Sequence, residues 1–121
     1  MSYDPQNIFA KILRGEIPCN KVYEDEYALA FHDIAPQALV HVLVIPKGPY
    51  VSHDDFSEKA SEAEIAGLAR AVGYVARELG LEVSGYRLIA NHGNDGGQEV
   101  PHYHVHICGG GRLGRMFALR D

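Results

Sequence analysis

The sequence predicts a single α+β domain over residues 1–121, with a mostly antiparallel sheet of about five strands, one short helix and one long helix. The length of 121 residues is close to the commonest size of one domain. The 46% apolar and 22% charged residues are ordinary values for a globular protein. The predicted order of elements is helix, two strands, strand, helix, two strands. Because helices and strands do not alternate, a parallel doubly wound sheet is disfavoured.

The N-terminal half predicts a short helix and three strands. Residues 7–14 carry apolar side chains at helical spacing and precede Gly15, a common residue at helix ends. Residues 21–24 and 27–31 predict the two strands of a hairpin. Residues 41–45 are a nearly continuous apolar run, which indicates a buried central strand.

The C-terminal half predicts the long helix and two more strands. An apolar stripe spaced by three and four residues consists of Ile65, Leu68, Val72, Val75, Ala76 and Leu79. Ser61 and Glu64 resemble a capping box, although a start one turn earlier, near Ser57, is also compatible with the sequence. Residues 86–90 and 102–108 predict strands, and the glycine-containing segment 91–98 between them predicts a loop.

Charge and cysteine content exclude several classes of protein. The net charge of -5 argues against binding a nucleic acid polymer, although a single nucleotide needs only a few well-placed donors. The apolar runs are far shorter than the ~20 residues of a membrane span, and the N-terminus shows no secretory signal. Two cysteines, Cys19 and Cys108, are too few for a disulfide framework. We therefore expect a cytoplasmic protein without membrane association.

The most informative segment is a row of three histidines that alternate with apolar residues. His102, His104 and His106 would share one face of a strand, because successive side chains of a strand point to opposite faces. The outer two would be about 13 Å apart along the strand, so all three can hardly bind one metal ion. A metal site would need two of them and an outside ligand such as His41, His92 or a carboxylate.

A second interpretation of the row is nucleophilic catalysis. A neutral imidazole can attack phosphorus and form a covalent intermediate, and the middle residue, His104, has a histidine on each side. The preceding segment 94–99 contains two adjacent glycines, which allow backbone N–H groups to approach an anion. A third interpretation is an exposed strand whose histidines are merely satisfied by hydrogen bonds.

The spacing of these residues resembles the signature of the histidine triad (HIT) family, in which three histidines alternate with apolar residues. Residues 96–107 carry the resemblance, and Tyr103, Val105 and Ile107 fill the apolar positions. The likeness extends to residues 7–12, 15–18, 22–25, 30–37 and 41–47, and is closest to the Hint branch of purine nucleoside phosphoramidases. The resemblance implies a homodimer whose two sheets join, and hydrolysis or transfer of a nucleoside monophosphate through a nucleotidyl-histidine.

The resemblance also implies roles for individual residues. His104 resembles the nucleophile, His106 the histidine that contacts a phosphate oxygen, His102 the first member of the triad, and His41 a supporting histidine. On the phosphate side the corresponding residues are Asn91, Gly97, Gln98 and Glu99. Asp33 resembles the carboxylate that binds the ribose hydroxyls. The apolar residues that resemble the clamp on a purine such as that of AMP or GMP are Ile8, Phe9, Ile17, Phe31 and Ile34.

The sequence departs from the family pattern in three ways. Asn7 and Ala10 stand where many members have zinc-binding cysteines, so we expect no structural zinc. The chemistry that the resemblance implies requires no metal ion, and we expect no metal and no cofactor. Glu99 stands where some Hint enzymes have a serine, and the C-terminal segment lacks a tryptophan found in some relatives. Other functions compatible with the sequence are a dinucleoside polyphosphate hydrolase or nucleotidylyltransferase, a nucleotide-binding regulatory protein with weak activity, and a metal-binding protein.

Overall fold

The computed structural model describes residues 2–118 and has the predicted α+β architecture. Five strands form one sheet in the order β1-β2-β3-β5-β4, in which every neighbouring pair is antiparallel. The strands are β1 (Lys21–Glu24), β2 (Ala28–His32), β3 (Val40–Pro46), β4 (Tyr86–Ile89) and β5 (Val105–Gly109). The apolar run predicted as a central strand is β3, which lies in the middle of the sheet and is buried along most of its length.

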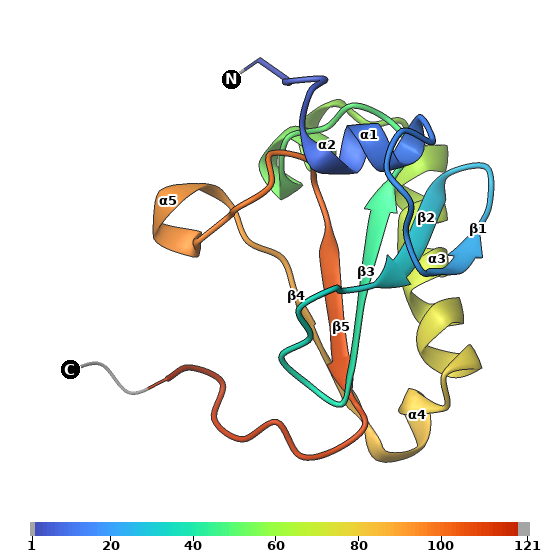
Figure 1. The fold of residues 1–121 in the computed structure, drawn as a ribbon, viewed down its shortest axis with the longest axis vertical. Helices are drawn as coiled ribbons and strands as arrows, with labels where there is room; N and C mark the ends of the chain where they lie inside the picture. Colours follow the sequence, from blue (N-terminus) through green and yellow to red (C-terminus); the bar gives the residue numbers. More distant parts are fainter. Residues whose placement is uncertain (1, 119–121) are drawn as a thin grey trace.

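Two helices cover opposite faces of the sheet. The long helix α3 (Glu62–Glu78) packs on one face through an apolar cluster that includes Val42, Val75 and Ile107. The short helix α1 (Ile8–Leu13) contributes Phe9 to a second cluster with Phe31. Figure 1 shows α1 near the end of β3 and α3 running alongside the strands. The central strands are therefore buried on both faces, as their apolar sequences require.

The helix ends confirm the predicted capping signals. The side chain of Ser61 accepts a hydrogen bond from the backbone of Glu64, and the Glu64 side chain accepts one from the backbone of Ser61. This capping box starts α3, so the possible start near Ser57 is wrong. That residue instead belongs to a separate helix, α2 (His53–Lys59). Gly80, in the left-handed conformation at φ 73°, follows α3 and precedes the short helix α4 (Leu81–Ser84).

The last strand is shorter than the sequence predicts. We expected a strand over residues 102–108, but β5 begins at Val105. The partner strand β3 ends at Pro46, which has no N–H to donate to a further ladder bond. Residues 102–104 contact the segment after Pro46 instead, since the N–H of Tyr103 donates to the carbonyl of Tyr50. The predicted loop 91–98 also contains a short helix, α5 (Gly93–Gly96), which projects from the sheet in Figure 1.

Candidate active site

Two of the three histidines of the row, His104 and His106, line a cavity of about 440 Å³. α1, the loop after β2, the loop after α5 and the start of β5 surround it. The predicted residues that line this cavity are Ile8, Phe9, Ile17, Phe31, Asp33, Ile34, Asn91, Gly97, Glu99, His104 and His106. His102 and His41 lie behind the cavity wall, where both are buried. The fold thus gathers residues from four distant segments around the triad.

The histidines do alternate with residues of the core. Tyr103, Val105 and Ile107 pack in the cluster under α3. The rings of His102 and His104 lie edge-on to Phe9 of α1, at centroid distances of 6.3 and 5.0 Å. The three imidazoles therefore share the face of the sheet that α1 covers, although His102 and His104 precede the ladder.

The hydrogen bonds of His104 fix the position of its proton. Its Nδ1 lies 2.7 Å from the carbonyl oxygen of His102, and a carbonyl can only accept. Nδ1 therefore carries the proton, and Nε2 keeps its lone pair in the neutral ring. Among residues 2–118, no donor occupies that nitrogen. His104 thus presents an unprotonated nitrogen, which is the form that attacks an electrophile.

His41 fixes the opposite tautomer in His106. The Nδ1 of His41 accepts the backbone N–H of Gln37 at 3.0 Å, so the proton of His41 is on Nε2. That Nε2 lies 2.8 Å from Nδ1 of His106 and donates to it. The neutral ring of His106 then carries its own proton on Nε2. His106 is therefore an N–H donor next to the ring of His104, and an oxygen of an anion such as phosphate can accept a hydrogen bond from it.

His102 is the least accessible member of the row, with no exposed surface. Its Nε2 lies 2.8 Å from the carbonyl of Pro46 and must donate to it. Its Nδ1 then accepts the hydroxyl proton of Tyr3, whose oxygen is 2.6 Å away. Both nitrogen atoms are used, so His102 supports its neighbours and does not reach the cavity.

Burial keeps the three imidazoles neutral. It lowers the pKa of His102 to about 4, where the nearby His104 adds to the effect and the bond to Pro46 opposes it. Burial also lowers the pKa of His106 to about 4, with smaller contributions from His104 and His41. For His104 burial again lowers the pKa, against the opposing effects of the carbonyl of His102 and of the Asp33 and Glu99 carboxylates. A neutral, nucleophilic His104 is the result at pH 7.

One part of the cavity is an apolar slot that ends at a carboxylate. The rings of Phe9 and Phe31 meet edge-on at 5.5 Å and form its floor with Leu43. At its rim, Oδ1 of Asp33 accepts the N–H of Ala35 at 2.8 Å, and Oδ2 lies 3.5 Å from Nε2 of His41. Such a slot suits a flat ring with a polar sugar attached.

The glycine-containing loop differs from its prediction. The N–H groups of Gly97 and Gln98 donate to the carbonyls of Asn94 and Gly93, so neither is free for an anion. The Gln98 side chain donates to the carbonyls of Val51 and Val100, and it does not line the cavity. Gln98 therefore holds the loop in place. Within the described chain the backbone N–H of Glu99, a residue that lines the cavity, has no hydrogen-bond acceptor.

Metal binding has two candidate locations. At the first, Asn7 and Ala10 offer an amide and a methyl group, and Asn7 accepts the N–H of Ala10 to cap α1, so these residues do not fit zinc. At the second, Asp33, His41 and His106 each offer one ligand atom, all within 4.8 Å of one another. An ion there would have to displace the proton that His41 donates to His106.

Several residues of the site escaped the sequence analysis. Tyr3 contacts His102 across 99 residues of sequence, and no local pattern indicates such a contact. Cys19 and Val100 line the cavity, as does Gln37, which also orients His41. Gln37 follows Asp33 and Pro36 in a segment that resembles the family, and this resemblance is the sequence signal that could have identified it as a site residue. Both cysteines are unpaired.

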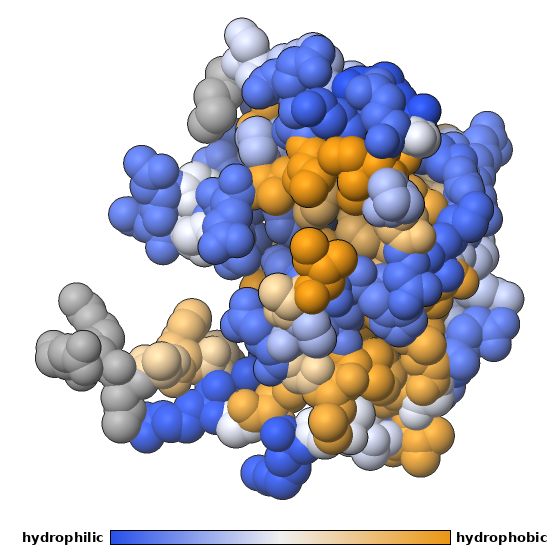
Figure 2. Space-filling model, viewed as in Figure 1, coloured by the Kyte–Doolittle hydropathy of each residue, from blue (hydrophilic) through white to orange (hydrophobic). Residues whose placement is uncertain are grey.

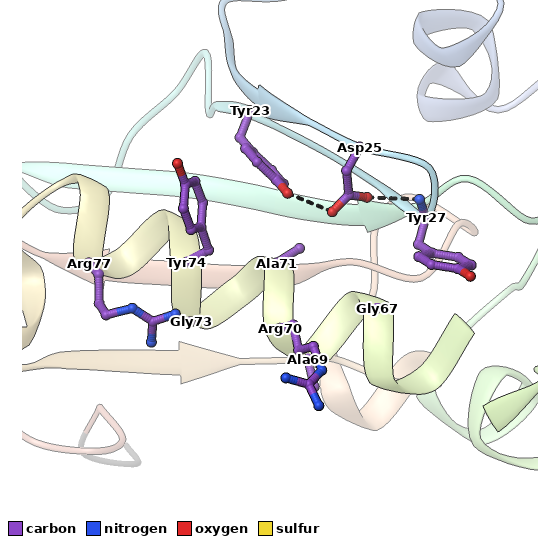
Figure 3. Close-up of a pocket in the computed structure, with 10 residues that line it drawn as sticks. All are labelled: Tyr23, Asp25, Tyr27, Gly67, Ala69, Arg70, Ala71, Gly73, Tyr74 and Arg77. Carbon is purple, nitrogen blue, oxygen red and sulfur yellow. Dashed lines mark hydrogen bonds between the residues drawn. The ribbon is translucent and has the colours of Figure 1, made fainter. Parts of the chain in front are cut away.

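A second hollow lies against α3 and contains no histidine (Figure 3). The Asp25 carboxylate accepts the hydroxyl of Tyr23 at 2.7 Å and the N–H of Tyr27 at 2.8 Å. The Tyr27 ring packs on Gly67, where a Cβ atom would come within 2.4 Å of the ring. The polar groups of the hairpin are thus satisfied by the hairpin itself, and this hollow is a packing contact between hairpin and helix.

Comparison with known proteins finds similarity over nearly the whole chain. Residues 14–113 match the HIT domain family. A 13.2 kDa HIT-like protein from Azospirillum brasilense, described as uncharacterized, is 65% identical over 95% of this chain and 94% of its own length. The purine nucleoside phosphoramidase of Escherichia coli strain K12 is 42% identical over 93% of this chain and 94% of its own length. The solved structure of a histidine triad protein from Clostridium difficile is 42% identical, with a TM-score of 0.84 over 94% of this chain and 98% of that one.

Proposed function

This chain belongs to the HIT family, and from that premise we propose that it hydrolyses purine nucleoside 5'-phosphoramidates through a nucleotide bound covalently to His104. The relative from Escherichia coli named purine nucleoside phosphoramidase supports this choice of substrate. The observation that carries the proposal is the hydrogen bond from Nδ1 of His104 to the carbonyl of His102, because it leaves Nε2 free to attack.

In the first half of the reaction, Nε2 of His104 attacks the α-phosphorus and the bond from phosphorus to the leaving nitrogen breaks. The leaving amine takes up a proton from solvent as this bond breaks, and departs. Charge on the phosphoryl oxygens is stabilised by the Nε2–H of His106, the side-chain amide of Asn91 and the N–H of Glu99. Preorganised donors of this kind are commonly the largest catalytic contribution. Water then attacks the phosphorus, the bond from phosphorus to Nε2 of His104 breaks, and the proton of this water passes to solvent. The nucleoside monophosphate is released and neutral His104 is regenerated.

The nucleoside occupies the apolar slot in this proposal. Its purine lies between the side chains of Ile8 and Ile34 and over the ring of Phe9, and Asp33 accepts hydrogen bonds from the ribose hydroxyls. A volume of about 440 Å³ is within the range of small-molecule sites, roughly 300–1,000 Å³. None of these steps uses a metal ion.

The substitution His104→Ala tests the nucleophile. We expect loss of adenosine 5'-phosphoramidate hydrolysis by at least about 10³-fold, with binding of AMP retained, because the slot and His106 remain. The matched control is His53→Ala, which removes an exposed histidine outside the cavity and should leave the rate unchanged. Wild-type turnover by the His104 variant would refute the proposal. Faster cleavage of a dinucleoside tetraphosphate than of the phosphoramidate would refute the substrate class.

We further propose that the protein is a homodimer joined along β4. β4 is an edge strand of the sheet, so one side of its backbone has no partner strand within the described chain. Its residues Tyr86, Leu88 and Ile89 are 39%, 49% and 37% exposed, an unusual amount for large apolar side chains on a short strand. The substitution Leu88→Glu should convert the dimer to a monomer in analytical ultracentrifugation, and a wild-type monomer would contradict the proposal.

No helix within residues 2–118 has the length and apolar character of a membrane span.

A further inference from the structure

A cavity of about 240 Å³, separate from the hollow against α3, adjoins the candidate active site. The two cavities share Gln37, Asn91 and His106, so they meet at the residues that would surround the phosphate. The small cavity extends toward β4 and the C-terminal segment, and Leu113 forms part of its wall. Figure 2 shows the surface indented between the projecting α5 segment and the C-terminal segment.

The register of the sheet brings Arg87 to this cavity. Arg87 of β4 is directly opposite Cys108 of β5, and Cys108 is opposite His41 of β3. Residues opposite one another in antiparallel strands point to the same face, so Arg87 lies on the face that carries His41. Ile89, two residues along β4, is opposite His106 and continues the cavity wall toward the phosphate.

Arg87 gives this cavity its charge. The guanidinium donates to the carbonyl of Gly114 at 3.0 Å and to that of Arg115 at 3.2 Å, which uses two of its five N–H groups. No carboxylate of the described residues forms an ion pair with it. The other lining side chains are apolar, amide, thiol or imidazole groups, and the Nδ1 atom of each imidazole accepts a hydrogen bond. Arg87 therefore brings a positive charge to the wall of this cavity, and three N–H groups of its guanidinium have no acceptor among the described residues.

We propose that this cavity receives the group displaced by His104, and that Arg87 selects leaving groups that carry a carboxylate or phosphate. This inference rests on the proposed function. In a displacement at phosphorus the leaving group lies opposite the attacking atom, so it must project away from Nε2 of His104. The nucleoside fills the larger cavity, and the smaller one is a recess that contacts both His106 and Asn91. The guanidinium fork matches a carboxylate or phosphate in shape as well as in charge.

The size of the cavity limits the leaving group. A volume of about 240 Å³ equals roughly eight water molecules at ~30 Å³ each, enough for an amine the size of a small amino acid. The substrate class that fits is therefore a nucleoside phosphoramidate whose amine bears a small anionic group.

A matched pair of substrates tests the charge preference. In both substrates AMP is linked through its phosphate to an amine. The amine of the first substrate is glycine, which leaves a free carboxylate, and that of the second is glycinamide, which is neutral and of similar shape. For the wild-type protein we expect kcat/KM to be about threefold to tenfold higher for the glycine conjugate. Conjugates of aminomethylphosphonate and aminomethanesulfonamide form the phosphate arm, and a larger preference there would identify phosphate as the recognised group. Equal rates within both pairs would overturn the inference.

Variants separate the charge of Arg87 from its contacts with the C-terminal segment. Arg87→Gln should abolish both preferences and leave hydrolysis of unsubstituted adenosine 5'-phosphoramidate within about twofold of wild type. Arg87→Lys keeps the positive charge and should keep a preference for the anionic conjugates. Equal rates with the anionic and neutral conjugates in this variant would overturn the role assigned to charge. Arg70→Gln removes an arginine on α3 (Figure 3), the helix on the face of the sheet opposite to α1, and should behave as wild type.

The same assays distinguish failure of this inference from failure of the proposed function. If wild-type protein hydrolyses none of the phosphoramidates, the proposed function is wrong. If it hydrolyses adenosine 5'-phosphoramidate but does not discriminate within either pair, only the assignment of Arg87 is wrong.

Discussion

Acidification from pH 7 to pH 5 should destabilise the fold through His102. Burial lowers its pKa to about 4 in the folded protein, against about 6.5 in the unfolded chain. Between these values the unfolded chain takes up a proton that the folded protein does not, so stability is present above pH 6.5 and is lost as the pH falls toward 4. At pH 5 about 97% of unfolded and about 9% of folded molecules are protonated there, which lowers the free energy of unfolding by about 2 kcal/mol.

Urea unfolding at a fixed protein concentration measures this loss. The comparison is between wild type and His102→Gln, which keeps a neutral polar side chain but does not titrate. His106 and the carboxylates remain in both proteins, so their contributions to the pH dependence cancel in the difference. The variant should lose about 2 kcal/mol less than wild type between pH 7 and pH 5. An equal loss in both proteins would show that His102 is not held neutral in the folded state.

Three further perturbations test other parts of the site. Phe9→Ala should raise the dissociation constant for AMP and lower the free energy of unfolding by about 3–5 kcal/mol, because it removes a buried ring between Phe31 and His104; unchanged AMP affinity would argue against the slot. His41→Ala removes the donor to His106 and should reduce kcat about tenfold while AMP affinity changes less than twofold, and an unaltered kcat would refute the tautomer assigned to His106. Dialysis against a chelator should leave hydrolysis unchanged, whereas a loss restored by zinc would favour a metal at Asp33, His41 and His106.

The sequence predicted the elements whose signals are local. The capping box of Ser61 and Glu64 marks the start of α3, and the apolar run of β3 marks the centre of the sheet. α2 was missed because Phe56 is its only buried side chain, so it has no apolar stripe. The start of β5 was misplaced because alternation continues through His102, whereas the ladder depends on where the partner strand ends.

The candidate site was predictable to the extent that the resemblance and the alternation of the histidines indicate it. The tautomers of the histidines could not be predicted, because they depend on partners that are distant in sequence. The tautomer of His102 depends on Tyr3 and Pro46, and that of His106 depends on His41. The sequence also could not show that the backbone N–H of Gly97, expected to contact a phosphate, is already hydrogen-bonded within the protein. Glycine permits approach to an anion, but it also permits a tight helical turn, and here the N–H of Gly97 bonds within that turn.

The most direct test of the central claim is to trap the covalent intermediate. Wild-type protein is mixed with adenosine 5'-phosphoramidate, quenched in denaturant at alkaline pH during turnover, digested, and examined by mass spectrometry. The account predicts one adenylyl group on the peptide that contains residues 102–106, attached at His104 and absent from the His104→Ala variant. Full turnover with no adenylyl group on any histidine, or with the group on His106, would contradict it.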